Sequence, residues 1–194
     1  MANKIKFGLR NVYYAVATIG NDGSATYGTP KALPGAVSLS LEPRGENNPF
    51  YADDIVYWGG IANSGYEGDL EIARITDDFR KDVLGYKVGG NGMLYEDANA
   101  TAKNFALLFQ FSGDEYATRH VLYNCTATRP NISGQTRGEN VEPQTETISL
   151  SAGSVFVSAL GTDIFKSDVA NVSATAAVYS AFYSSVTLPT AAST

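Results

Sequence analysis

Residues 105–128 read FALLFQFSGDEYATRHVLYNCTAT, two apolar runs joined by a Ser-Gly-Asp-Glu turn. In residues 105–111 both alternating faces are apolar up to Gln110, which predicts a central strand covered on both sides. Residues 118–128 predict the antiparallel return strand. By strict alternation, one face of that return strand carries Val121, Tyr123, Cys125 and Ala127.

The same two-residue period recurs on both sides of this pair. Residues 12–18 predict a strand that runs into a Gly-Asn-Asp-Gly turn at 20–23. Residues 37–42, 66–72 and 145–150 alternate apolar and polar side chains, and Gly68 indicates a bulge or a close backbone approach. The core faces of the first two of these strands are expected to carry Val37, Leu39, Leu41, Tyr66, Leu70 and Ile72.

One short helix is expected at about residues 76–85. Thr76 can cap its first turn, and Gly85 suits its end. Phe79, Val83 and Leu84 form one apolar stripe for packing on a sheet. Residues 178–183 fit a strand or a helix equally well. The chain is therefore predicted to be mainly β, a β-sandwich or barrel with one short flanking α-helix.

Length and charge bound the class of protein. With 194 residues we expect a β-sandwich over 1–150 with a long loop at 43–65, completed by a C-terminal segment, 151–194, that ends in a loose tail. Twenty acidic against fourteen basic residues give a net charge of −6. This charge argues against tight DNA binding, which comes mainly from neutralising phosphates. Like charge would still let DNA slide through a passage without sticking.

Cysteine content and the N-terminus bear on the compartment. Cys125 is the only cysteine, so an internal disulfide is excluded. The chain opens with no apolar leader, and no stretch is long enough to cross a membrane. We therefore expect synthesis in a cytoplasm and no membrane partner.

The segment from 43 to 65 is unusual for a self-contained domain. Loop-forming residues flank the only tryptophan and other large apolar side chains, which predicts a long surface loop. A surface loop has little core in which to bury such side chains, so they are expected to contact another protein. The alternative is that the segment folds back on its own sheet. The candidate assembly residues are Phe50, Tyr51, Ile55, Val56, Tyr57 and Trp58.

Residues that could carry catalysis are few. His120 is the only histidine, and strict alternation points it away from Cys125, so no Cys–His pair is expected. Three carboxylates, at 67, 69 and 71, share one strand face; a cation site or a glycosidase pair is conceivable, but a solvated face is the common outcome. Asp53-Asp54 lacks the calcium-loop pattern. We expect no catalytic, cofactor-binding or metal-binding residue, and no enzyme.

An ordered set of segments resembles the major tail proteins, or tail tube proteins, of long-tailed siphophages of Gram-positive bacteria, the phi13 type. The resemblance covers roughly residues 1–150, and the Tyr179…Pro189 ending also looks similar. The segments are 34–43 (PGAVSLSLEP), 50–53 (FYAD), 65–72 (GYEGDLEI), 79–85 (FRKDVLG), 105–109 (FALLF), 119–125 (RHVLYNC) and 145–148 (TETI).

This resemblance implies a structural virion protein with a β-sandwich-like fold and one flanking helix. Such proteins form stacked hexameric rings around a tape-measure protein, with terminator and initiator proteins at the tube ends. The genome passes through the lumen without specific binding. The resemblance also implies that the loop at 43–65 orders on stacking, that the protein resides in the virion tail, and that it is made in the host bacterial cytoplasm.

Two other functions remain open at this point. A ring protein of a contractile secretion or injection system would have a similar fold. A carbohydrate-binding β-sandwich, such as a receptor module, would also use exposed tryptophan and tyrosine near carboxylates.

Overall fold

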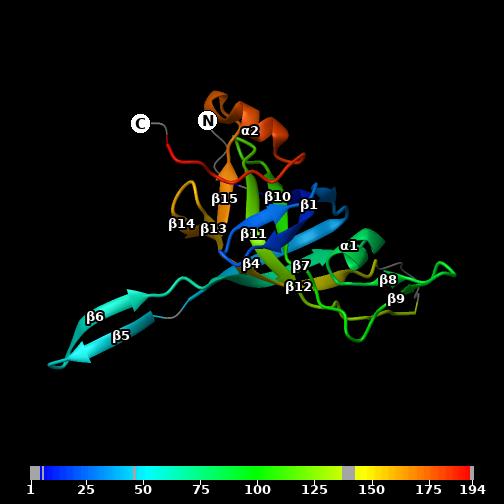
Figure 1. Ribbon diagram of the computed structural model, residues 1–194, viewed down its shortest axis with the longest axis horizontal. Helices are drawn as coiled ribbons and strands as arrows, with labels where there is room; N and C mark the ends of the chain where they lie inside the picture. Colours follow the sequence, from blue (N-terminus) through cyan, green and yellow to red (C-terminus); the bar gives the residue numbers. More distant parts are fainter. Residues whose placement is uncertain (1–4, 6, 46, 137–142, 193–194) are drawn as a thin grey trace.

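The computed structural model describes residues 5, 7–45, 47–136 and 143–192. Its main sheet is antiparallel with the order β2-β1-β10-β11-β12-β7-β4, and β3 and β15 join it beside β1 and β11 (Figure 1). This path does not close on itself, so the predicted mainly-β fold is confirmed as a sandwich and not a barrel. The strands are β1 (Phe7–Ile19), β2 (Ala25–Tyr27), β3 (Lys31–Ala32), β4 (Ala36–Arg44), β7 (Gly65–Ile72), β10 (Phe105–Ser112), β11 (Arg119–Ala127), β12 (Glu146–Gly153) and β15 (Lys166–Val169).

The remaining elements are small. Three two-stranded hairpins lie outside the main sheet in the described part of the chain. They are β5 (Asn47–Ala52) with β6 (Ile55–Ile61), β8 (Lys87–Val88) with β9 (Leu94–Tyr95), and β13 (Val155–Val157) with β14 (Thr162–Ile164). The helices are α1 (Asp77–Asp82), the 3-10 turn η1 (Ser173–Thr175) and α2 (Ala176–Ala181).

Strand β11 divides the sheet into two layers. Its first half pairs with β15 and its second half with β12, so β12, β7 and β4 turn away from β1 and β10. The first core lies between these layers and is closed by α1, where Phe79 meets Tyr14 and Phe105 edge to face. A second core covers the other face of β1, β10 and β11. Strand β10 is buried on both faces, which confirms the prediction of a central strand.

The prediction of one continuous apolar face on β11 is wrong. Phe105 pairs with Cys125, but Leu107 pairs with Leu122, so the return strand holds one extra residue there. Such a bulge reverses the alternation beyond it. Val121 and Tyr123 consequently face the second core, whereas Leu122, Cys125 and Ala127 face the first.

A second irregularity corrects the prediction for β4. The pairing with β7 slips between Ala36 and Ser38, and Val37 is 52% exposed instead of facing the core. Leu39 and Leu41 are half-buried against the first core, as expected from their spacing.

The helix forms where its caps predict it, although it is shorter than 76–85. The Thr76 hydroxyl accepts a hydrogen bond from the Phe79 amide at 3.3 Å. Phe79, Val83 and Leu84 are all buried, and Gly85 takes the left-handed conformation with φ of 79°.

The C-terminal residues cover the second core. Residues 178–183, which fit either structure by pattern, include the end of α2, and Phe182 is buried in the second core. The Arg119 guanidinium lies 3.7 Å from the ring centre of Tyr179 and 4.6 Å from that of Tyr183. Across the described residues, neither helix has the length and apolar character needed to cross a bilayer.

Candidate assembly site

The segment expected as a long irregular loop is a β-hairpin that projects from the sandwich. Strands β5 and β6 leave the ends of β4 and β7 and extend away from both cores (Figure 1). Asp53 and Asp54 form its turn with φ of 51° and 58°, as a two-residue type I′ hairpin turn requires. The sequence did not reveal the turn because Asp-Asp is a weaker turn signature than Asn-Gly or Asp-Gly.

A bulge shapes the hairpin near its apolar residues. Phe50 pairs with Trp58 and Tyr51 with Val56, so Tyr57 is the extra residue in β6. A Cβ atom on Gly60 would lie 2.3 Å from the Trp58 ring, so the glycine leaves the space in which the indole lies against the strand. The local backbone therefore accommodates the tryptophan on the surface of the hairpin.

The structure brings the predicted assembly residues together on this hairpin. Phe50, Tyr51, Ile55, Tyr57 and Trp58 are each between 60% and 70% exposed, and none belongs to either core. The side chain of Val56 lies outside the described part of the structure. The alternative in which the segment folds back on its own sheet is not the conformation observed.

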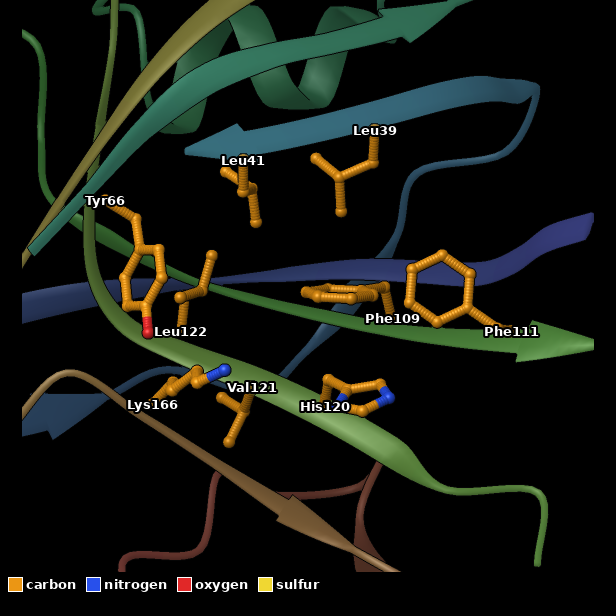
Figure 2. Close-up of a pocket in the computed structure, with 9 residues that line it drawn as sticks. All are labelled: Leu39, Leu41, Tyr66, Phe109, Phe111, His120, Val121, Leu122 and Lys166. Carbon is orange, nitrogen blue, oxygen red and sulfur yellow. The ribbon is translucent and has the colours of Figure 1, made fainter. Parts of the chain in front are cut away.

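A half-open groove lies at the side of the sandwich, between the edge strand β4 and strands β10 and β11 (Figure 2). Its volume is about 250 Å³. Leu39 and Leu41 point from β4 toward the opposite wall (Figure 2). The groove is lined by Leu39, Leu41, Tyr66, Phe109, Phe111, His120, Val121, Leu122 and Lys166.

His120 forms part of this groove. Its ring stacks on Phe109 at 5.3 Å and meets Phe111 at 5.6 Å. The parity argument that separated His120 from Cys125 fails because the bulge lies between them. Cys125 is fully buried, and burial raises the pKa of its thiol to about 12. The reactive thiolate therefore does not form near neutral pH.

The three carboxylates on β7 form an outward polar face with their neighbours. Ser149 donates a hydrogen bond to Asp69 at 2.7 Å, and Glu71 accepts hydrogen bonds from Thr145 at 2.7 Å and Ser38 at 2.9 Å. Hydrogen bonds from Thr145 and Ser38 lower the pKa of Glu71 below its ordinary value of 4.5. Asp69 and Glu71 are therefore satisfied by hydroxyl groups, whereas Glu67 lies 3.9 Å from the Arg44 guanidinium in an exposed ion pair. Within the described ranges, no three His, Cys, Asp or Glu side chains are arranged to hold a metal ion.

Sequence reasoning did not find the groove. Its walls come from β4, β7, β10, β11 and β15, which lie far apart in the chain. The sequence signal for the groove was the alternation of Leu39 and Leu41 with polar residues, which predicts only a core-facing side of a strand. In the structure both side chains are half-buried.

The fold is an antiparallel β-sandwich from which a hairpin with five exposed large apolar side chains projects. The chain matches the phage tail tube protein family over residues 2–177 and belongs to that family. It is thus a structural protein of the phage tail. Among curated proteins, no sequence matches this chain.

Proposed function

We propose that this chain assembles with copies of itself into stacked hexameric rings that form the tail tube, the conduit through which the phage genome is delivered. One observation supports this most: five large apolar side chains are exposed on a hairpin that belongs to neither core. Monomeric proteins rarely leave such a patch uncovered. In a chain of the tail tube family, other copies of the same protein are the natural partners.

The hairpin is the contact between rings in this proposal. Phe50, Tyr51, Ile55, Val56, Tyr57 and Trp58 would anchor one ring to the next. Tryptophan and tyrosine are common hot spots at interfaces, because they bury large areas with few rotatable bonds. The bulge residue Tyr57 and the neighbouring Trp58 are the first two side chains to test.

Contacts within a ring would use the edges of the main sheet. Strand β4, with nine residues, ends the strand path on one side, and β2 ends it on the other. An exposed edge of this length presents unpaired backbone groups to any other strand. Pairing edges around a closed ring would satisfy these groups.

The outward face of β4, β7 and β12 supports a lumen role. Asp69 and Glu71 lie between serine and threonine residues of the flanking strands, and Glu67 lies between Ser151 and a further carboxylate, Glu42. A DNA backbone would be repelled by this face instead of held on it. In this proposal, a tape-measure protein fills the lumen during assembly, and terminator and initiator proteins bind the tube ends.

Replacing both Tyr57 and Trp58 with serine tests the proposal. We expect the wild-type chain to form hollow tubes of uniform width in negative-stain electron microscopy across a concentration series. The double variant should remain a folded monomer, because both side chains are exposed and support neither core. Circular dichroism and thermal unfolding measure the retained fold.

A matched control removes apolar surface elsewhere. Val88 and Ile132 are exposed at 56% and 101%, and replacing both with serine should leave tubes intact. Unchanged tube assembly by the Tyr57 and Trp58 variant would refute the role of the hairpin. A wild-type monomer that never forms tubes but binds a glycan array would favour the carbohydrate-binding alternative.

A further inference from the structure

We propose that the groove between β4 and β11 is the receptor for the β5–β6 hairpin of a neighbouring copy. This inference rests on the proposed self-assembly and adds to it the surface that the hairpin contacts. An aromatic side chain of the hairpin would enter between Leu39 and Phe109, and the turn at Asp53 and Asp54 would lie near Lys166.

The groove has the shape and chemistry of a receptor for an apolar side chain. Leu39 and Leu41 form one wall, and the rings of Phe109 and His120, stacked at 5.3 Å, form part of the other (Figure 2). A concave apolar surface with a few polar groups at its margin is the usual form of a binding site. The aromatic rings offer faces and edges for stacking with a further ring.

The hairpin supplies the matching surface. Its five described apolar side chains are at least 60% exposed, so they gain from burial against another molecule. The strands extend six and seven residues, roughly 20 Å, away from the ends of β4 and β7 (Figure 1). Because the hairpin points away from its own sandwich, the groove that it enters belongs to another copy.

Charge also matches the two surfaces. The hairpin turn presents Asp53 and Asp54, both exposed, and the margin of the groove presents Lys166. The Lys166 ammonium lies 5.2 Å from the ring centre of Tyr66 and forms none of the ion pairs found among the described residues. Opposite charges at the rim of an apolar contact favour one orientation of the partner.

The positions of hairpin and groove determine how such a contact propagates. They are different surfaces of one chain, so each copy offers a hairpin to one neighbour and a groove to another. Such head-to-tail contacts form rings when the rotation closes and open-ended stacks when it does not. A contact of this kind suits a tube that grows by addition.

Disulfide trapping between two variants tests the contact directly. One variant carries Trp58→Cys and the other carries Leu39→Cys, and both full-length chains are mixed, assembled and oxidised mildly. The native Cys125 is fully buried, so it leaves little background. We expect a dimer on a non-reducing gel only from the mixture, because bonding requires Cα atoms within about 7 Å. Each variant alone should remain monomeric on the gel.

A second mixture serves as the control. Met93 is 66% exposed near the β8–β9 hairpin, and Met93→Cys offers an equally accessible thiol outside the groove. Cross-linking of Trp58→Cys to Met93→Cys and not to Leu39→Cys would overturn the groove assignment while leaving hairpin-driven assembly intact. Tubes in which neither mixture cross-links would also overturn it. A wild-type chain that stays monomeric, with no cross-link from any mixture, would overturn both proposals.

A charge placed in the groove provides an independent measurement. Leu39→Glu should raise the protein concentration at which tubes appear by at least about 30-fold, as expected when a binding hot spot is lost. Val37→Glu is the matched control, because Val37 is exposed on the same strand and does not line the groove. Equal assembly by the two variants, with both shown to be folded by circular dichroism, would contradict the proposal.

Discussion

Gly68 shows how one residue decides whether two strands can lie together. A Cβ atom at this position would lie 1.9 Å from the carbonyl oxygen of Ser40 on the neighbouring strand. The pairing of β7 with β4 and with β12 runs through Gly68 without a slip. Of the two roles predicted for this glycine, close backbone approach is therefore the one observed.

We expect Gly68→Ala to destabilise the sandwich by about 1–3 kcal/mol, because the added methyl must push the β4 backbone away. Urea unfolding measures the change. Gly134→Ala is the matched control: no atom lies within 4 Å of its Cβ position, so its stability should stay within about 0.5 kcal/mol of the wild type. Equal midpoints for the two variants would show that the strands adjust without cost.

At the scale of elements, one arginine from β11 contacts the C-terminal helix. Arg119 lies over the Tyr179 ring and donates a hydrogen bond to the Tyr179 carbonyl oxygen. Burial raises the pKa of the adjacent Tyr183 to about 12, so its phenol stays neutral beside the guanidinium. Helix α2 has six residues and is too short to persist without such contacts.

Replacing Arg119 with alanine should release α2 from the second core. We expect a loss of roughly 2 kcal/mol from the lost cation–π contact and charged hydrogen bond. Amide hydrogen exchange should accelerate at residues 176–188 and stay unchanged in β7. Arg129→Ala is the control, because Arg129 forms an exposed ion pair with Glu96 at 2.8 Å. Unaltered exchange at the C-terminus of the Arg119 variant would show that apolar packing alone holds the helix.

At the scale of the whole molecule, the acidic face and the hairpin are two separate surfaces, to which we assign different roles in the proposed tube. Glu67, Asp69 and Glu71 lie on β7, the strand that follows the hairpin, on the outward face of the layer formed by β12, β7 and β4. A ring that turns this face inward would present a negative, hydroxyl-rich wall to the genome. The net charge of −6 is consistent with DNA that passes and is not retained.

Replacing Glu67 and Asp69 with lysine should give tubes that retain DNA. The change raises the net charge from −6 to −2, since each substitution adds two charges. Binding measured by co-sedimentation should fall as salt rises, because phosphate contacts release counterions. Glu115→Lys with Asp163→Lys makes the same change at exposed sites off this face and should not retain DNA. Equal retention by both variants would refute the lumen assignment.

Local pattern was sufficient to predict several main elements of this fold, although it missed the β5–β6 hairpin and left residues 178–183 open between strand and helix. The central strand at 105–111, the cap at Thr76 and the turn at 20–23 were all predicted correctly, and the Gly20 amide bonds the Ser24 carbonyl at 2.8 Å in that turn. Each of these depends on residues close together in the chain. The family resemblance likewise followed from ordered segments and is confirmed by the family match.

Only the tertiary structure decided which way several side chains point. A bulge in β11, opposite the segment between Phe105 and Leu107, reversed the faces of the strand and placed Cys125 in the first core. Alternation is a property of one strand, but its phase is set by the partner strand, which lies elsewhere in the sequence. The groove also depends on long-range pairing. Strands β4 and β11 come to line it because β11 pairs with β15 in its first half and with β12 in its second, which turns β12, β7 and β4 away from the rest of the sheet. The sequence alone thus determined the central strands and the exposed apolar segment. The hairpin form of that segment comes from a local Asp-Asp turn that sequence patterns signal weakly, whereas long-range pairing decided the surface that we propose receives it.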